Sequence, residues 1–270
     1  MLIAITRDIS PNFNQCELTH LTRTPIDVAL ARQQHHAYQV ALRRLGCEVI
    51  TLPAEPDLPD SVFVEDAAIV LDEVALITRP GAASRRPEAQ LIAEALRPYR
   101  ALRYIEAPGT VDGGDVLRIG RSLYVGRSSR SNQSAIDQLQ RHLAPFGYAV
   151  QGVEVTGCLH LKSAVTQVAV DTLLINPQWV DRAYFTGCRL IEVDPNEPGA
   201  ANAVWVAPPA RVDRAGQTDW GVIYPSNFPR TRQRLIDAGI PVFIVAASEV
   251  QKAEGAVTCC SLIFRKSGTM

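Results

Sequence analysis

The chain has 270 residues, of which 47% are hydrophobic and 20% are charged, and its formal net charge is −1 at pH 7. This balance is typical of a globular protein with a buried core and argues against intrinsic disorder. Lys and Arg are scattered without forming a basic stripe, which argues against nucleic-acid binding. The longest apolar runs, such as "PVFIVAA", are far shorter than the roughly 20 residues that cross a bilayer, so we expect no membrane span.

The six cysteines show no paired spacing, and no C-x-x-C occurs in the chain. Zinc-ribbon, iron–sulfur and thioredoxin-like sites therefore lack their usual sequence support, and free thiols in a reducing compartment are the simplest account. The N-terminus, "MLIAITRDIS", lacks the basic start and long apolar core of a signal peptide. We therefore expect a cytoplasmic protein without a bound metal.

The first fifty residues predict a strand, a turn-rich loop, a helix and a second strand. The strands are "MLIAIT" and "EVITLP", and the loop is "SPNFNQCELTHLTRTP". Between them, Thr24-Pro25 favours a helix start and Gly46 favours its end. The apolar face of this helix contains Ala31, Tyr38, Leu42 and Leu45.

The rest of the chain repeats one pattern: a strand, a tight turn, a strand, a helix and a strand. In the first repeat, "VFVEDAAIVLDEVALITRP" turns at Asp72-Glu73, and a helix over residues 86–96 leads to the strand "ALRYIEA". In the second, "GGDVLRIGRSLYVGRSS" turns near Gly120-Arg121, and a helix capped by Ser131 ends at Gly147 before the strand "YAVQGVEV". The apolar stripe of that second helix contains Ile136, Leu139, Leu143 and Phe146.

Three more repeats complete the chain. The third, "LHLKSAVTQVAVDTLLINP", turns at Asp171-Thr172 and continues through a short helical piece to "CRLIEV". The fourth consists of "AANAVWVAPP", "WGVIYPS", a helix around residues 231–238 and "PVFIVAA". The fifth begins with "VTCCSLIFR" and takes its helix and its other strands from the N-terminus.

Five repeats of one kind, the last one completed by both chain ends, predict a ring. Radial repetition of small sheets is the way in which propellers protect their strand edges. We therefore expect a pseudo-symmetric α/β propeller with five blades, built from ββαβ repeats. It would form a single domain over residues 1–270 whose N- and C-terminal segments close the ring.

Polar residues mark the start of the opening strand in every repeat. These residues are Glu65-Asp66, Asp112, His160, Asn202 and Cys259. In a ring, the equivalent ends of the inner strands meet around one axis, so we expect these side chains to converge in one central cavity.

Taken singly, several of these residues also have a structural interpretation. A buried cysteine usually acts as a small hydrophobic residue, and "DGGD" reads as a turn. Taken together, Cys, His and Asp are the residue types that a thiol nucleophile needs: a sulfur that attacks, an imidazole that moves protons and a carboxylate that orients the imidazole.

The remaining charged residues indicate the kind of substrate. Glu65 and Asp66 would place negative charge beside the thiol, which favours a cationic group. Arg85 and Arg130 each follow a second strand and could bind a carboxylate in bidentate fashion. A cation at one end and a carboxylate at the other describe a free basic amino acid.

Six segments of the chain, in this order, resemble the dimethylarginine dimethylaminohydrolase family of the guanidino-group modifying (pentein) superfamily. They are "DSVFVEDAAIV", "ALITRPGAASRR", "DGGDVL", "VGRSSRSNQ", "LHLKS" and "GAVTCCS". The resemblance extends over essentially the whole chain and implies a five-bladed α/β propeller. It also implies a hydrolase that converts Nω-methylated L-arginine to L-citrulline and methylamine or dimethylamine, without a metal or organic cofactor.

The resemblance also implies a role for each matching residue. Cys259 corresponds to the nucleophile that forms a covalent thiouronium, His160 to the general acid and base, and Asp112 to the carboxylate that orients His160. Side chains alternate between the two faces of a strand, so Cys259 and Cys260 would point to opposite faces. This is compatible with Cys259 as the nucleophile, but alternation alone does not say which face meets the cavity. The implied substrate-binding residues are Glu65 and Asp66 for the guanidinium, Arg85 and Arg130 for the carboxylate, and Asp60 with the main chain of Leu18 and Ala253 for the α-amine. Leu18 lies in a segment, residues 10–25, that resembles the mobile lid of the family.

Other functions remain open from the sequence. Arginine deiminase would use the same residues on unmethylated arginine, although those enzymes are typically longer, and an amidinotransferase or another guanidino-compound hydrolase is a further alternative. A different class is a propeller that binds arginine-like ligands, or senses redox state through Cys259-Cys260, without catalysis. The chain could form a homodimer, but no element is singled out for the interface.

Overall fold

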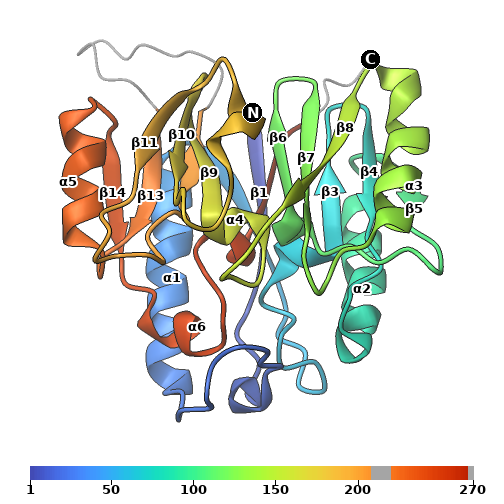
Figure 1. Cartoon of the computed structure of the whole chain (residues 1–270). Helices are drawn as coiled ribbons and strands as arrows, with labels where there is room; N and C mark the ends of the chain where they lie inside the picture. Colours follow the sequence, from blue (N-terminus) through green and yellow to red (C-terminus); the bar gives the residue numbers. More distant parts are fainter. Residues whose placement is uncertain (208–219, 267–270) are drawn as a thin grey trace.

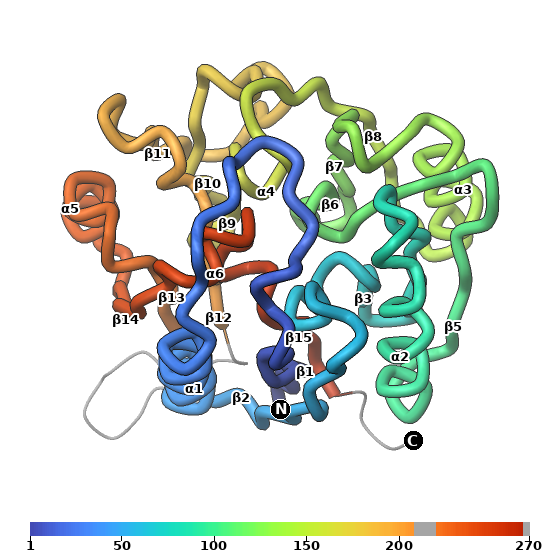
Figure 2. Tube along the Cα trace, turned by 90° about the horizontal axis from the view of Figure 1, so that it is seen from below, coloured from blue at the N-terminus to red at the C-terminus, as the bar shows by residue number. Residues whose placement is uncertain are grey.

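The computed structural model describes residues 1–207 and 220–266 and arranges them as five three-stranded sheets in a ring (Figures 1 and 2). In each sheet the first strand of the repeat pairs antiparallel with the second, which pairs parallel with the third. The five sheets are β3 (Ala68–Val70), β4 (Val74–Ile77) and β5 (Ala101–Tyr104); β6 (Val116–Ile119), β7 (Ser122–Arg127) and β8 (Ala149–Glu154); β9 (Val165–Ala169), β10 (Thr172–Ile175) and β11 (Arg189–Glu192); β12 (Val204–Val206), β13 (Gly221–Pro225) and β14 (Val242–Val245); and β15 (Leu262–Arg265), β1 (Leu2–Arg7) and β2 (Cys47–Leu52).

Each parallel pair of strands needs a crossover connection, because a tight hairpin can join only antiparallel strands. Four blades use an α-helix for this crossover, on the outside of the ring (Figure 2): α1 (Val28–Arg44), α2 (Arg86–Leu96), α3 (Gln133–Leu143) and α5 (Pro229–Asp237). The third blade uses the short helical turn η6 (Arg182–Phe185) instead. The ββαβ repeat is therefore confirmed, and α2 occupies the predicted residues.

The two ends of the chain complete the fifth blade. β1 lies in the middle of this sheet, with β15 antiparallel on one side and β2 parallel on the other. The pairing of Leu2 with Arg265 and of Ile5 with Leu262 joins the first residues to the last described strand. The five-bladed α/β propeller is confirmed. Pro208 and Pro209, at the end of the predicted segment "AANAVWVAPP", lie outside the described residues.

Two predicted helix starts are wrong by one to a few residues. α1 begins at Val28, because the side chain of Asp27 accepts the N–H of Leu30 at 2.9 Å and so satisfies a free amide of the first turn. α3 is capped by Asn132, which accepts the N–H of Ala135 at 3.1 Å, whereas Ser131 donates instead to the buried carboxylate of Asp115.

The polar residues of the repeats lie in or next to helical turns just before the inner strands, and not on the strands as predicted. Glu65, Asp66 and Cys259 are inside such turns, whereas Asp112 and His160 are the extended residues that directly precede theirs. These turns are η2 (Val64–Ala67), η4 (Gly113–Asp115), α4 (Leu161–Ala164) and η7 (Thr258–Cys260), and Asn202 lies in the loop before β12. Cys259 and Cys260 therefore share a helical turn, and the argument from strand alternation does not apply to them. A tight turn at the hub presents both main-chain N–H groups and side chains toward the axis of the ring.

Five short helices complete the structure: η1 (Phe13–Gln15), η3 (Ala83–Arg85), η5 (Ala144–Phe146), α6 (Ser248–Lys252) and the turn η6 given above. Figure 2 shows the N-terminal segment, in blue, crossing the face of the ring between η1 and α1. Within the described ranges, no helix has both the length and the apolar character that a membrane span requires.

Candidate active site

The predicted residues converge at the hub of the ring, beneath the lid segment (residues 10–25). A cavity of about 20 Å³ lies there. Its lining includes seven of the predicted residues, namely Asp60, Asp66, Arg85, Arg130, His160, Ala253 and Cys259. The other lining residues are Glu17, Phe63, Leu159, Glu254 and Gly255. Asp112 contacts His160 directly, whereas Glu65 lines a separate cavity and Leu18 is half-buried in the lid.

His160 is held by Asp112. Its Nε2 lies 3.1 Å from Oδ2 of Asp112, which is completely buried and whose Oδ1 accepts the N–H of Gly81 at 2.9 Å. Burial lowers the pKa of His160, but the charge of Asp66 and the hydrogen bond with Asp112 outweigh burial and raise this pKa to about 9. The imidazole is therefore protonated at neutral pH and can donate a proton.

Asp66 is the buried anion next to this imidazolium. Its Oδ1 accepts the N–H of Gly114 at 3.0 Å, and its Oδ2 accepts Nη1 of Arg85 at 2.7 Å. Burial raises the pKa of Asp66, but the charges of His160 and Arg85 exceed that effect and lower it overall. Asp66 therefore keeps its negative charge in the cavity.

The thiol of Cys259 lies in the same negative surroundings. Burial, followed by the charges of Asp66 and Glu65, raises the pKa of Cys259 well above its ordinary value. These effects keep the sulfur a neutral thiol at neutral pH. A cation beside Asp66 and Glu65 would offset their charge and favour the thiolate, which is the nucleophilic form.

Glu65, which is buried, forms an ion pair with a half-buried lysine that the sequence did not reveal. Its Oε1 accepts Nζ of Lys162 at 2.7 Å, and Lys162 also donates to the carbonyl oxygen of Gly113 at 3.2 Å. Oε2 of Glu65 is buried without a hydrogen-bond partner. A cavity of about 270 Å³ is lined by Glu65, Gly113, Lys162 and other residues. An unpaired buried carboxylate oxygen is free to accept an N–H donor.

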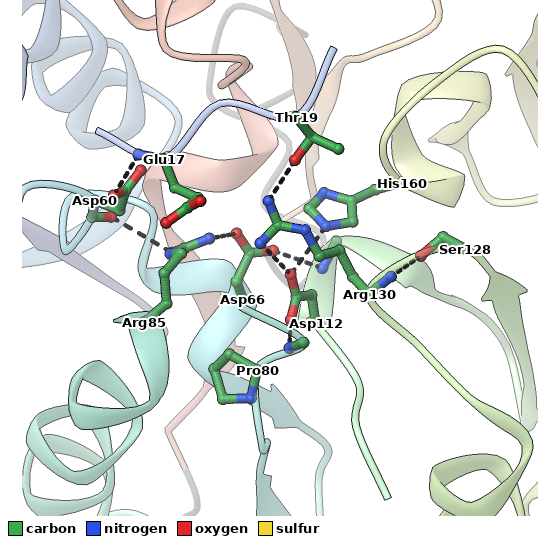
Figure 3. Close-up of polar contacts among 12 residues, drawn as sticks. Glu17, Thr19, Asp60, Asp66, Pro80, Arg85, Asp112, Ser128, Arg130 and His160 are labelled. Atoms are coloured by element: carbon green, nitrogen blue, oxygen red, sulfur yellow. Dashed lines mark hydrogen bonds and ion pairs between the residues drawn. The ribbon is translucent and has the colours of Figure 1, made fainter. Parts of the chain in front are cut away.

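The two predicted carboxylate-binding arginines both face the cavity but have different partners (Figure 3). Arg85 is buried and donates to Asp66, to both oxygens of Glu88 and to main-chain oxygens. Arg130 donates from Nη2 to Oγ1 of Thr19 in the lid at 2.7 Å, and its Nη1 lies 3.9 Å from Oδ2 of Asp112. Arg130 thus links the lid to the hub, whereas Arg85 is tied to the buried acids.

Asp60 joins the cavity to the lid. Its Oδ2 accepts the N–H of Glu17 at 2.9 Å, and burial raises its pKa. Ala253, the third predicted α-amine contact besides Leu18, is buried at the C-terminal end of α6.

Two glycines are essential to the packing of the site and were read in the sequence only as part of a turn. A Cβ on Gly114 would lie 2.7 Å from Nδ1 of His160 and 2.9 Å from Oδ1 of Asp66, and one on Gly113 would overlap the carbonyl oxygen of Glu65. Asp115, next in the chain, is buried and accepts hydrogen bonds from Ser128, Ser131 and the N–H of Leu161. The segment "DGGD" therefore holds three neighbouring turns of the hub together.

The ligand atoms of Asp66, Asp112 and His160 lie within 4.8 Å of one another, which is compatible with metal binding. However, both oxygens of Asp66 already accept N–H groups, and Arg85 and Arg130 place positive charge beside the group. A metal cation would have to displace these contacts, so the arrangement does not favour one.

The fold and the hub together define a five-bladed α/β propeller with a cysteine, a histidine and buried carboxylates at its centre. A family model described as N,N dimethylarginine dimethylhydrolase, eukaryotic, matches residues 12–184. The dimethylarginine dimethylaminohydrolase of Streptomyces coelicolor is 38% identical over 264 residues, which cover 97% of each chain. That of Pseudomonas aeruginosa is 36% identical over 240 residues, or 88% of this chain and 90% of the relative.

A solved structure agrees with these relatives. A mutant of the Pseudomonas aeruginosa protein, in complex with citrulline, superposes with a TM-score of 0.88 at 35% identity and covers 97% of this chain and 98% of its own. The chain belongs to the dimethylarginine dimethylaminohydrolase family. The resemblance found in the sequence is therefore confirmed.

Proposed function

We propose that this protein hydrolyses Nω-methylated L-arginine to L-citrulline and methylamine or dimethylamine. The observation that carries the proposal is one small cavity lined by a thiol, a protonated imidazole and a buried carboxylate: Cys259, His160 and Asp66. Membership of the family and the citrulline complex of a relative support the same reaction.

In this proposal the two acids of η2 bind the guanidinium. The free Oε2 of Glu65 accepts one N–H, and Asp66 supplies a second negative charge. Arg130 and Arg85 bind the α-carboxylate. The α-amine donates hydrogen bonds to the carboxylate of Asp60 and to the main-chain oxygens of Leu18 and Ala253. These roles require Arg130 to exchange its contact with Thr19 for the substrate.

The first chemical step forms a carbon–sulfur bond. The bound cation offsets the charges of Asp66 and Glu65, so the thiol of Cys259 loses its proton to solvent and the thiolate adds to the guanidinium carbon. His160 donates its proton to the departing nitrogen, and the carbon–nitrogen bond breaks. Methylamine or dimethylamine leaves, and a positively charged S-alkylthiouronium remains on Cys259.

The second step uses water. His160, now neutral, removes a proton from a water molecule, and the resulting hydroxide adds to the thiouronium carbon. The carbon–sulfur bond then breaks and its electron pair returns to the sulfur. The proton of the new hydroxyl group passes to this sulfur, so citrulline leaves, Cys259 is again a neutral thiol and His160 is again protonated. Asp112 holds the imidazole in place during both steps and stabilises its charge.

The substrate class is tested by incubating the protein with arginine, monomethylarginine and asymmetric dimethylarginine and measuring citrulline. We expect citrulline from the two methylated compounds and little from arginine. A preference for arginine would favour a deiminase that uses the same residues, and a product formed only with an added amine acceptor would favour an amidinotransferase. Ligand-induced stabilisation without any product would favour the non-catalytic binder and contradict our proposal.

Three further expectations remain predictions. We expect the protein to act in the cytoplasm, since all six cysteines are free. We expect one folding domain over residues 1–270, which a single unfolding transition would support. A homodimer is testable by light scattering of the purified protein.

A further inference from the structure

The C-terminal end of α6 has an unusual residue for its backbone conformation. Glu254 has φ of 58°, and among the described residues it is the one residue other than glycine with a positive φ. The N–H of Glu254 bonds to the carbonyl oxygen of Gln251 at 3.1 Å, and that of Gly255 bonds to Val250 at 2.9 Å. This is the hydrogen-bond pattern of a Schellman motif, in which the left-handed position normally holds glycine because a Cβ is crowded there.

The carboxylate of Glu254 explains why a side chain is present at this position. It accepts the N–H groups of Thr19, His20 and Leu21, at 2.9, 2.5 and 2.5 Å. Successive main-chain N–H groups that point to one side form a concave site for an anion. Hydrogen bonds to a charged acceptor are also about twice as strong as those between neutral groups.

The tip of the lid, which we define as residues 17–21, has few other contacts. The side chains of Glu17, Thr19, His20 and Leu21 are exposed, and Leu18 is half-buried. Its other hydrogen bonds to described residues outside the lid come from Asp60, Ser84 and Arg130. With so little apolar burial, polar contacts must hold the tip in place.

The neck of the lid is held separately. Asn14 exchanges two side-chain hydrogen bonds with the main chain of Ile26, and Arg23 donates to the carbonyl oxygens of Asn14 and Cys16. The tip can therefore leave the cavity while the neck keeps its position, as in a compact Ω-loop.

The size of the cavity requires such a motion. About 20 Å³ holds roughly one water molecule, so an amino acid cannot enter while the tip is closed. Glu254 lines this cavity between Ala253 and Gly255, which line it as well. Together with Asp60, it thus links the main chain of the lid to the wall of the cavity.

We propose that Glu254 is a positioning residue that latches the tip of the lid over the bound substrate through three consecutive amides. This inference rests on the proposed function, because the latch would be useful by keeping bulk water away from the thiouronium until His160 activates one water molecule. Closing the tip brings the three amides to this carboxylate. Opening breaks three hydrogen bonds at one residue.

Hydrogen exchange of the free protein tests the latch without any turnover. In Glu254→Gln and Glu254→Gly we expect the amides of Thr19, His20 and Leu21 to exchange at least about tenfold faster, with unchanged exchange in the strands. Glu254→Gly should also keep or raise the melting temperature, because glycine is favoured at a positive φ. Unchanged exchange of the three amides would overturn the latch, whether or not the protein hydrolyses methylarginine.

Steady-state kinetics separate a latch from a general structural role. We expect Glu254→Gln to raise KM for asymmetric dimethylarginine about tenfold and to change kcat by less than about threefold. Ser84→Ala, which removes a single exposed contact to Glu17, is the matched control and should leave KM within about twofold. An equal effect of both substitutions would contradict a specific latch.

A direct contact of Glu254 with the α-amine of the substrate is the competing explanation. The same kinetics with a dimethylguanidino acid that lacks the α-amine distinguish the two. A latch predicts that Glu254→Gln raises KM for this analogue as well. Loss of the effect with the analogue would show that Glu254 binds the amine and would overturn the latch.

Discussion

The hub and the lid of this propeller are built in opposite ways. At the hub, Asp66 and Asp112 are almost completely buried, and each accepts at least two polar contacts from other elements. At the tip of the lid, most side chains are exposed, and the main chain is held by Glu254 and Asp60. The difference indicates that the reacting groups are fixed before the substrate arrives, while access is controlled by a segment of low local stability.

The largest expected effect concerns the sulfur at the hub. Replacing Cys259 with Ser should lower kcat/KM for asymmetric dimethylarginine by at least about 1,000-fold, because a hydroxyl is not ionised at neutral pH. Cys260→Ser should keep most of the activity, since Cys260 does not line the central cavity. Equal losses in the two variants, measured as citrulline release, would contradict the assignment of the nucleophile.

The second prediction concerns the close packing at the hub. Gly114→Ala would place a methyl group against His160 and Asp66, so we expect kcat to fall about 100-fold through misplacement of the imidazole. The control is Gly120→Ala, because Gly120 has φ of 58° and no atom near its Cβ position. That variant should lose about 1 kcal/mol of stability and little activity. Similar activity of both variants would show that the site tolerates displacement of the His160 imidazole.

The third prediction compares a partly buried ion pair with a surface pair. Lys162→Met leaves Glu65 without its partner, so we expect a loss of about 2 kcal/mol in the free energy of unfolding and at least about tenfold in kcat/KM. In Arg127→Met the lost partner, Glu154, is exposed, and the cost should stay below about 0.5 kcal/mol. Urea unfolding of both variants gives the comparison. Equal costs would mean that the hub pair is as weak as a surface pair.

The last prediction concerns the pH dependence of stability and involves no change in activity. The pKa of His160 is about 9 in the folded protein and about 6.5 in an unfolded chain. The contribution of His160 to the free energy of unfolding is therefore fully present below pH 6.5. It is lost as the pH rises toward 9, and it amounts to at most about 3 kcal/mol. His160→Gln should flatten this part of the profile of unfolding free energy. A slope in that window as steep as that of the unchanged protein would show that other groups cause it.

The repeating pattern of the chain was sufficient to predict the ring. Apolar runs of strand length, turns such as Asp72-Glu73 and a helix over residues 86–96 depend on local chemistry, and the structure contains each of them. The convergence of the predicted residues also follows from the pattern, because every repeat enters its inner strand at the same end of the blade. Seven of them line one cavity.

Other features depend on contacts between residues that are far apart in the chain. Lys162 pairs with Glu65 across 97 positions, and Glu254 binds His20 across 234 positions. Neither partner is marked by its own neighbours in the sequence, so a local pattern cannot reveal the pair. The need for glycine at Gly114 likewise arises from His160 in the next blade.

The sequence by itself determined the five ββαβ repeats, the closure of the ring by the two chain ends and the family, because these depend on local periodicity and on short motifs kept in order. Only the tertiary structure decided that the polar residues lie before the inner strands, in or next to helical turns and in one loop, which acids are paired and what holds the lid. These features are set by distances between blades, and the packing of the whole ring is needed to fix such distances.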